Sequence, residues 1–306
     1  MVKHLYVMSD THDDVEAVAR AVDFVKSEGR GNSRIIHAGD FSLKPYTREA
    51  LDNLKGTGDV ASFWRAKEEH TADILNSYKE VLDASGMPWM AIPGNYDGNL
   101  EGVFGSSDIH GRAEDFDGIK VVGYGGAGDG DGPWIGPEHM QPLVKAGQIQ
   151  MFNSKDLSDL LARENPAIAV THSPPRGLCD DMFNGAHVGT PTMTKYLQEN
   201  DGLKLVISGH IHEAGPGGSN PNGVCGVSGI ERASGERTIV VNPGNLGRFG
   251  LLDTNTLAPV REFDFGTFAR VDIEDDGTPI KVTQYSVQEQ GRTVGEVRQV
   301  GEYNLK

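Results

Sequence analysis

The sequence predicts a layered α/β fold, and three observations carry this prediction. Short apolar runs bounded by turn residues recur along the chain, at 4–9, 34–39, 89–94, 120–126, 167–172, 204–209 and 238–244. Apolar residues follow one another almost without interruption in these runs, instead of alternating with polar residues. This is typical of strands that are covered on both faces. Helical patterns lie between several of the runs, and this alternation of strand and helix favours helices layered over sheets.

Four helical segments separate the predicted strands. An apolar stripe at helical spacing covers residues 14–28 and ends at Gly29, and a longer stripe covers residues 60–84. Ser154 precedes a third predicted helix. Thr190 and Pro191 begin a fourth, because threonine is a frequent N-cap and proline fits the first helical position.

The C-terminal part of the chain has a different pattern. Residues from about 247 to 290 read as β-hairpins, one of them with an Asp-Gly turn, and we expect them to join a second sheet. Residues 127–150, which include Trp134, are rich in glycine and proline and predict a long loop with a binding role. Because no repeat or linker interrupts the pattern, residues 1–306 are expected to form a single domain.

Composition excludes several classes of partner. The formal net charge is −16, from 28 basic and 44 acidic residues, so binding to nucleic acid or to an anionic membrane surface is unlikely for lack of a basic footprint. No apolar run reaches the ~18 residues that a membrane span needs. The two cysteines, Cys179 and Cys225, cannot make a disulfide framework. We therefore expect a cytoplasmic protein whose thiols stay reduced and buried.

Polar residues of ligand type follow five of the predicted strands. In chain order they are Asp10, His12, Asp40, Asn95, His172, His210 and His212. Each residue alone has an ordinary explanation, since Asp and Asn favour turns and a loop histidine is usually solvated. Their shared position is the stronger signal, because open α/β sheets build sites at the carboxyl ends of their strands. His37 lies inside its strand and is expected to be a core histidine.

The residue types indicate a metal centre. Burying several carboxylates and imidazoles together without a cation would be costly. Two Asp, one Asn and four His, with no Cys, suit Mn, Fe, Co, Ni or Zn better than Ca or Mg. Seven ligand groups are too many for one tetrahedral ion. The sequence therefore predicts two divalent transition metal ions that share a carboxylate.

These blocks resemble the calcineurin-like metallophosphoesterase superfamily. The matching segments are Asp10-x-His12, Gly39-Asp40, Gly94-Asn95, His172 and Gly209-His210-Ile211-His212, in this order, within about residues 4–250. Further segments resemble a prokaryotic branch of small cytoplasmic phosphoesterases. The resemblance implies a four-layer α/β/β/α sandwich with a two-metal centre. It places Asp10, His12, Asp40 and His212 on the first metal, and Asp40, Asn95, His172 and His210 on the second.

The implied activity is metal-dependent hydrolysis of a small phosphate ester, by attack of a metal-bridging hydroxide on phosphorus. This sequence departs from the family at two positions. A histidine that protonates the leaving group often follows the metal-binding Asn, supported by an Asp three residues after the bridging Asp; here those positions hold Tyr96 and Leu43. Because general acid catalysis supplies ~10²–10⁴-fold, phosphodiesters or activated esters are favoured over simple monoesters.

Several roles stay open. Tyr96 could donate a proton or a hydrogen bond, or it could pack against the substrate or the protein. Arg176, just past His172, is a candidate for a charge-assisted contact to phosphate, and His187 is a candidate for lining the same mouth of the site. Asp97, Asn242 and Asn245 are candidates for structural support of the site or for turns. Two rival functions remain: a nuclease, and a metal-bound scaffold for a protein partner with little catalysis. The natural substrate, the native metals and the oligomeric state do not follow from the sequence.

Overall fold

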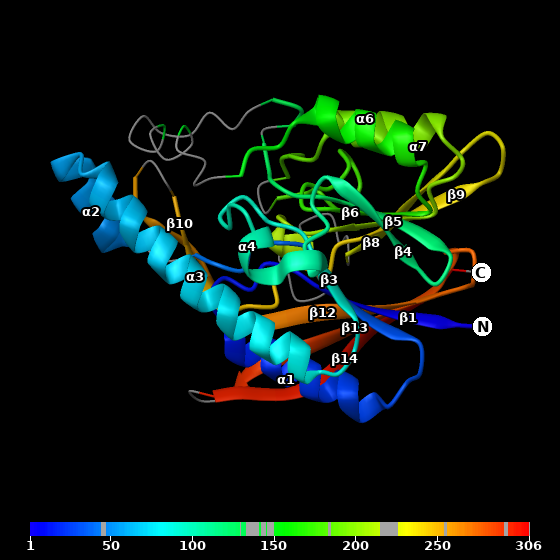
Figure 1. Ribbon diagram of the computed structural model, residues 1–306, viewed down its shortest axis with the longest axis horizontal. Helices are drawn as coiled ribbons and strands as arrows, with labels where there is room; N and C mark the ends of the chain where they lie inside the picture. Colours follow the sequence, from blue (N-terminus) through cyan, green and yellow to red (C-terminus); the bar gives the residue numbers. More distant parts are fainter. Residues whose placement is uncertain are drawn as a thin grey trace.

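The computed structural model contains two six-stranded sheets that pack face to face, with helices on their outer faces (Figure 1). It describes residues 1–43, 47–128, 130–132, 141, 145, 150–182, 185–214, 226–253, 256–290 and 293–305. Most of the predicted 127–150 loop, with Trp134, and also Cys225, lie outside the described residues.

The first sheet has the strand order β14-β13-β12-β1-β2-β3. Its parallel half consists of β1 (Lys3–Met8), β2 (Ser33–His37) and β3 (Trp89–Ala91). Its antiparallel half consists of β12 (Phe265–Ile273), β13 (Pro279–Gln290) and β14 (Thr293–Asn304), with β12 paired to β1. The carboxyl ends of β1, β2 and β3 therefore lie at one edge of this sheet.

The second sheet has the order β4-β5-β6-β7-β9-β8. Four central strands are parallel: β5 (Ile119–Tyr124), β6 (Ile168–Thr171), β7 (Leu205–Ser208) and β9 (Arg237–Val241). The antiparallel edge strands are β4 (Arg112–Phe116) and β8 (Val227–Glu231). Neither edge strand is among the sequence-based predictions, because both are rich in polar residues.

Helices cover the outer face of each sheet (Figure 1). On the first sheet lie α1 (Val15–Glu28) and α3 (Val60–Ala84), and on the second lie α6 (Ser154–Glu164) and α7 (Pro191–Glu199). These are the four predicted helices. Short elements complete the described chain: α2 (Arg48–Thr57), α4 (Glu101–Phe104), η1 (Gly105–Ser107), η3 (His212–Ala214) and a two-stranded sheet of β10 (Phe249–Leu252) and β11 (Pro259–Phe263). No described helix is both long and apolar enough to cross a membrane.

Three buried clusters follow from the alternation of side chains along the strands. Leu5 and Val7 of β1 face the second sheet and pack with Ile168 and Val170 of β6. Tyr6 and Met8 point the other way, toward α1 and α3. On the far side, residues of α6 and α7 pack over the second sheet. The layered α/β fold predicted from the sequence is confirmed, and the layers form the α/β/β/α sandwich that the family resemblance implies.

The C-terminal hairpins differ from the prediction in their place and extent. Strands β12 to β14 extend the sheet that begins with β1, and they continue to Asn304 instead of ending near residue 290. The reason is that β2 occupies only one edge of β1, so β12 can pair antiparallel along the other. The hairpin of β10 and β11 stays outside both large sheets and lies near α2 (Figure 1).

Candidate metal centre

The seven predicted ligand residues come from loops directly after β1, β2, β3, β6 and β7. Hydrogen bonds between these loops fix their positions. Asp10 N donates to Gly39 O (2.9 Å), His12 N donates to Asp40 O (3.1 Å), and Gly209 N donates to His172 O (3.0 Å). The last bond joins two loops of the second sheet, whereas the first two join loops of the first.

Four ligand positions have left-handed backbones. The φ angles are 52° at Asp10, 44° at His12, 60° at Asp40 and 68° at His210. Asp and His tolerate this region better than most residues, yet such strain persists only where the surrounding structure enforces it. Its concentration here marks these strand ends as a functional site.

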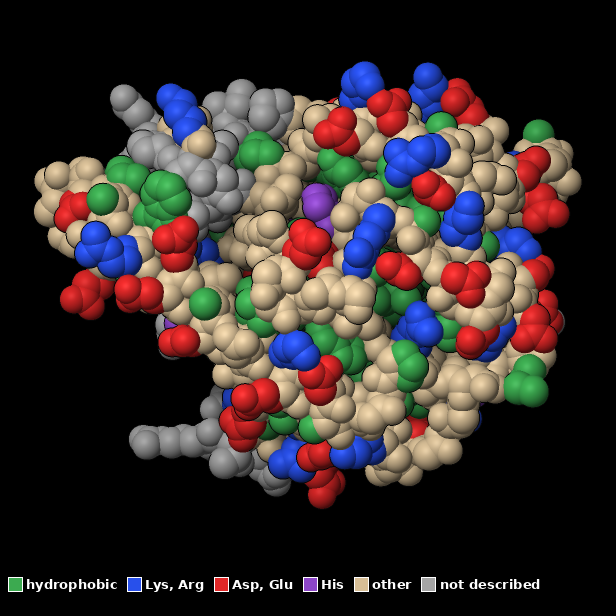
Figure 2. Space-filling view, in the orientation of Figure 1, with side chains coloured by type: hydrophobic (Ala, Val, Ile, Leu, Met, Phe, Trp, Pro, Cys, Tyr) green, Lys and Arg blue, Asp and Glu red, His purple; other side chains and the backbone are tan. Residues whose placement is uncertain are grey.

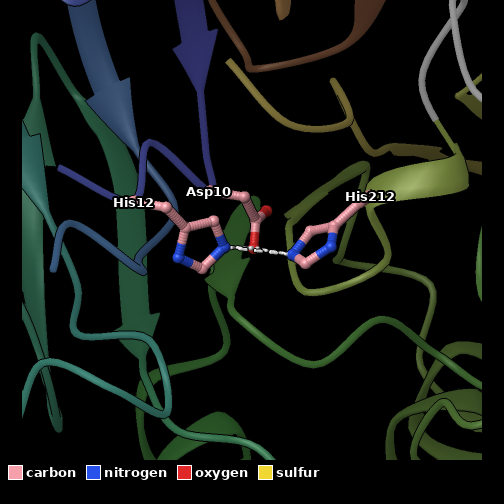
Figure 3. A group of neighbouring side chains, drawn as sticks. All are labelled: Asp10, His12 and His212. Atoms are coloured by element: carbon pink, nitrogen blue, oxygen red, sulfur yellow. Dashed lines mark hydrogen bonds and ion pairs between the residues drawn. The ribbon is translucent and has the colours of Figure 1, made fainter. Parts of the chain in front are cut away.

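The first group consists of Asp10, His12 and His212 (Figure 3). Asp10 Oδ1 lies 3.3 Å from His212 Nε2 and 3.9 Å from His12 Nε2. The two Nε2 atoms are 3.1 Å apart. The carboxylate thus points between two converging imidazoles (Figure 3).

The second group consists of Asp40, His172 and His210. Asp40 Oδ2 lies 3.3 Å from His172 Nε2 and also 4.0 Å from His12 Nε2, so this oxygen stands between the two groups. Asn95 Oδ1 is 3.2 Å from His172 Nε2. His172 Nδ1 is 2.7 Å from Ala38 O, which leaves Nε2 to face the carboxylate.

The residues present fit a pair of cations. Asp10 Oδ1 is buried and accepts no hydrogen bond, and His12 Nδ1 is likewise buried without a partner among the described residues. A buried carboxylate oxygen without a donor is costly unless a cation compensates it. The possible metal ligands around this oxygen, among the described residues, are carboxylate oxygens and imidazole nitrogens. Such ligands suit divalent transition metals of intermediate softness.

Electrostatics keep both carboxylates ionised. Burial opposes ionisation of Asp40, but His172 and the N–H of Tyr96 outweigh it and lower the pKa of the carboxyl group. Burial also opposes ionisation of Asp10, and contact with His212 lowers its pKa in the same way. Burial lowers the pKa of His12 and of His210 to about 4, so these two imidazoles are neutral at pH 7, as metal ligands must be.

The site is closed on one side and open on the other. Asp10, His12, Asp40 and His172 are buried, whereas Asn95, His210 and His212 keep part of their surface exposed. Such an arrangement leaves room for a substrate next to the ligands, unlike a fully enclosed structural metal site.

Supporting residues surround the ligands. Asp97 accepts hydrogen bonds from the backbone N–H groups of Asp40, Phe41, Ser42 and Gly94, at 2.8–2.9 Å. Asn242 donates from Nδ2 to Gly209 O (3.0 Å) and so holds the loop before His210. Asn245 has a similar role in its own turn, where Nδ2 donates to Gly247 O.

His37 is the core histidine that its position within a strand predicts. It is fully buried, stacks on Phe41 at a ring distance of 3.7 Å, and accepts a hydrogen bond from Gly39 N. Burial lowers its pKa to about 3, so the ring is neutral. Cys179 is also buried as expected, and burial raises the pKa of its thiol.

Arg176 and His187 are exposed residues between β6 and α7. The His187 ring contacts Asp180 (2.8 Å) and Asp181 (3.4 Å), and Asp180 itself accepts hydrogen bonds from the backbone N–H groups of Gly177 and Gly189. Asp180, Asp181 and His187 form a third group of ligand-type side chains. The phosphate contact of Arg176 and the place of His187 in the mouth of the site stay predictions.

Two features of the site are absent from the sequence-based prediction. Asp13, next to His12, accepts a hydrogen bond from Leu43 N (3.2 Å) and lies 2.6 Å from His70 Nε2. Lys67 is buried on the inner face of α3 and donates to Ser42 Oγ. Ser42 is also one of the residues whose backbone N–H is bound by Asp97. The buried face of α3 includes residues 67, 71, 75 and 78. Their spacing of three and four residues is the sequence signal that places Lys67 on the face of the helix turned toward the core.

A family model described as calcineurin-like phosphoesterase matches residues 3–214, which include all seven ligand positions. The chain belongs to the calcineurin-like phosphoesterase family. As a calcineurin-like phosphoesterase it is a metal-dependent phosphoester hydrolase, and the family uses a dinuclear centre of divalent metals. The family match confirms the resemblance to calcineurin-like phosphoesterases, and with it the prediction of two divalent metal ions as cofactors.

Solved structures share this fold. The 5'-nucleotidase precursor from Thermus thermophilus is 12% identical and has a TM-score of 0.51, over 97% of this chain and 56% of that chain. A dimetal phosphatase from Danio rerio is 10% identical with a TM-score of 0.50, over 97% of this chain and 98% of that one. At such identities the likeness concerns the fold alone. No curated protein sequence matches this phosphoesterase significantly.

The pKa of His172 predicts how metal binding depends on pH. Burial alone would lower this pKa, but Asp40 raises it to about 9, so the ring carries a proton at pH 7 when no metal is bound. A metal requires the neutral ring and must displace that proton. We expect metal affinity to rise up to ~10-fold per pH unit between pH 7 and 9.

Titration calorimetry of chelator-treated protein with Mn²⁺ in buffers of different ionisation enthalpy measures this proton release. In the metal-free protein the same raised pKa stabilises the fold fully below the ordinary histidine value of 6.5, and that stabilisation is lost as the pH rises through about 9. An affinity that is constant from pH 7 to 9, with no proton released, would contradict the assignment.

Proposed function

We propose that this phosphoesterase hydrolyses small phosphodiesters or activated phosphate esters at a two-metal centre. The observation that carries the proposal is the position of Asp40 Oδ2, within 3.3 Å of His172 Nε2 in one ligand group and 4.0 Å of His12 Nε2 in the other. A carboxylate between two imidazole clusters suits a ligand shared by two cations.

The seven ligand residues divide into two sets in this proposal. The first metal binds Asp10, His12, Asp40 and His212, and the second binds Asp40, Asn95, His172 and His210. When bound, such a pair of ions supplies an activated water and neutralises charge on the phosphoryl oxygens. Asn95 contributes a neutral oxygen, so the two carboxylates leave the centre with a net positive charge that attracts a phosphate.

The preference for diesters or activated esters rests on the groups beside Asn95. Tyr96 packs with a small apolar cluster that includes Leu43, Phe63 and Leu257. Its burial, and then the nearby Asp40, raise the pKa of its hydroxyl. A weaker acid than ordinary tyrosine is a poor proton donor to a leaving group. The substrate's own leaving group must therefore depart without much help from this position.

Replacing Tyr96 with phenylalanine tests its role directly. Because the ring packs with apolar neighbours and the hydroxyl is a poor acid, we expect kcat for an aryl phosphodiester to change by less than ~5-fold, well below the ~10²–10⁴-fold of a general acid. Steady-state kinetics from pH 6 to 10 measures it. A loss above 100-fold would assign the proton to Tyr96.

A small substrate agrees with the charge of the molecule. On the face drawn in Figure 2, acidic and basic side chains are interspersed and no basic patch stands out. With a net charge of −16, the surface outside the metal centre repels a polyanion such as nucleic acid.

The deciding experiment compares a bis-aryl phosphodiester with the matching aryl monoester, on protein loaded with Mn²⁺. We expect the diester to turn over faster. Asn95→Ala is the control for the metal centre and should lose the activity, while Asn200→Ala, at the end of α7, should keep it. Full metal occupancy with neither ester cleaved would reject the proposal, and faster cleavage of the monoester would reject the diester preference.

A further inference from the structure

A cavity of about 500 Å³ opens beside the first ligand group. Its described lining residues come from three regions that are distant in sequence: the segment after β1, the start of α2, and β10. They are His12, Asp13, Asp14, Leu43, Thr47, Arg48, Arg248, Phe249, Gly250 and Leu252. Figure 1 shows α2 and β10 on the same side of the molecule. Because His12 is part of the wall, the cavity adjoins the first ligand group.

One wall of the cavity is apolar and begins at the metal ligands. The Phe249 ring lies 4.2 Å from the His12 ring and 4.8 Å from the His212 ring, and it stacks on Phe263 at 5.0 Å. Leu43 and Leu252 continue this wall and are only partly buried. A volume of 500 Å³ is in the range of small-molecule sites. The space therefore suits a ring-sized organic group.

The charged side chains that line the cavity differ in how well neighbouring protein groups neutralise them. Asp14 accepts two hydrogen bonds from the Arg248 guanidinium, at 2.7 and 3.1 Å, and one from the Arg248 backbone N–H at 3.0 Å, and it also caps α1. Asp13 is hydrogen-bonded by Leu43 N and contacts His70. Arg48, in contrast, is 64% exposed, and its Nε is 3.8 Å from Asp52, which is long for an ion pair. Among the described lining residues, Arg48 is thus the cation best placed to pair with a ligand.

We propose that this cavity is the binding site for one ester group of the substrate, and that it selects an aromatic or similarly flat group with an anionic substituent at its outer end. Phe249, Leu43 and Leu252 contact the ring, and Arg48 pairs with the anion. The inference rests on the proposed function, because it assumes that the phosphoryl group binds at the metals. It narrows the substrate class from phosphodiesters in general to those with an acidic aryl-like ester group.

Binding of phosphonates tests the cavity without any need for turnover. Mn²⁺-loaded protein is titrated calorimetrically with benzylphosphonate, 4-carboxybenzylphosphonate and inorganic phosphate. We expect the carboxylated ligand to bind ~5-fold more tightly than benzylphosphonate, as a partly exposed ion pair allows. Arg48→Gln should remove this difference. Arg163→Gln, which neutralises an arginine of similar exposure on α6, should keep it.

A second variant tests the apolar wall. Leu252→Trp should fill the cavity and weaken benzylphosphonate ~10-fold or more, the value of burying one aromatic ring, while leaving inorganic phosphate unchanged. Val260→Trp, at an exposed position of the neighbouring strand β11, is the control. Equal binding of the two phosphonates to the wild-type protein, or a difference that survives Arg48→Gln, would overturn the charge selection. Unchanged benzylphosphonate binding in Leu252→Trp would overturn the site.

The two proposals fail in different ways. If the diester is hydrolysed but the cavity variants bind every phosphonate like the wild type, the hydrolase assignment stands and the cavity assignment falls. If no ester is cleaved but the phosphonates discriminate as expected, the cavity is a ligand site and the hydrolase proposal falls.

Discussion

Replacing Gly94 with alanine should abolish the two-metal centre. Gly94 precedes Asn95, and a Cβ atom at this position would overlap both the carboxylate and the backbone nitrogen of Asp40. The Asp40 backbone has little freedom to withdraw, because its N–H is bound to Asp97 and its carbonyl to His12 N. The Asp40 side chain and the loop that carries Gly94 and Asn95 must both shift, and the contacts of Asp40 Oδ2 and Asn95 Oδ1 with His172 are lost.

The expected loss follows from the position of Asp40 Oδ2 between the two ligand groups. In the proposed centre both ions share this carboxylate, so its displacement affects both, and a loss of ~4 kcal/mol of transition-state stabilisation corresponds to ~10³-fold in rate. We therefore expect Gly94→Ala to bind less than one metal per chain and to hydrolyse the diester at least ~10³-fold more slowly. Metal analysis after gel filtration and steady-state kinetics measure the two effects.

Gly56→Ala is the matched control. Gly56 lies in α2, where an added Cβ meets no atom within 4 Å. Alanine is the better helix former by ~1 kcal/mol, so this variant should be as active as the wild type and slightly more stable. Two bound metals and full activity in Gly94→Ala would show that the Asp40 carboxylate is not confined as the structure indicates.

The convergence of the seven candidate ligands could be predicted from sequence because every one of them follows shortly after one of five strands. Asp10, Asp40 and His172 are all recognisable from a local run of apolar residues and a turn, and parallel strands bring such ends together without any knowledge of side-chain packing. The family resemblance added the pairing of ligands, and the structure brings all seven residues into two adjoining groups.

Features that depend on the packing of distant segments could not be predicted in this way. The contact of His70 with Asp13 spans 57 residues, and the cavity lining combines α2 with β10, about 200 residues later. The placement of β12 beside β1 depended on which strand edge was still unpaired, and apolar periodicity does not report that. Polar interactions of this kind leave almost no periodic signal in a single sequence.

Asp97 illustrates the same limit and gives the second large effect. Its position next to Tyr96 indicates a turn or a supporting role but not its partners: its two oxygens accept hydrogen bonds from four backbone N–H groups of the loops that carry Asp40 and Asn95. Burial lowers the pKa of Lys67 to about 8. The negative charge of Asp97 opposes this shift more strongly than that of Asp13 or Asp40. The residue therefore joins the two ligand loops and balances a buried lysine.

We expect Asp97→Ala to lower the free energy of unfolding by ~3–5 kcal/mol. Each buried donor left without an acceptor costs ~1–3 kcal/mol, and entry of water keeps the total below the sum over four. Asp97→Asn keeps the shape and one acceptor oxygen, so it should lose about half as much. Urea denaturation of the metal-free proteins measures both variants, because metal binding would otherwise add its own stabilisation.

The comparison with Asp159→Ala separates the clamp from a general effect of removing charge. Asp159 is 61% exposed on α6 and pairs with Lys155 in the preceding turn, so its loss should cost less than ~0.5 kcal/mol. Metal affinity gives a second readout: Asp97→Ala should also bind Mn²⁺ more weakly, since the Asp40 and Asn95 loops are no longer tied together. If Asp97→Ala is as stable as Asp159→Ala, the four hydrogen bonds are replaced by water at no cost, and Asp97 is not what joins the two loops.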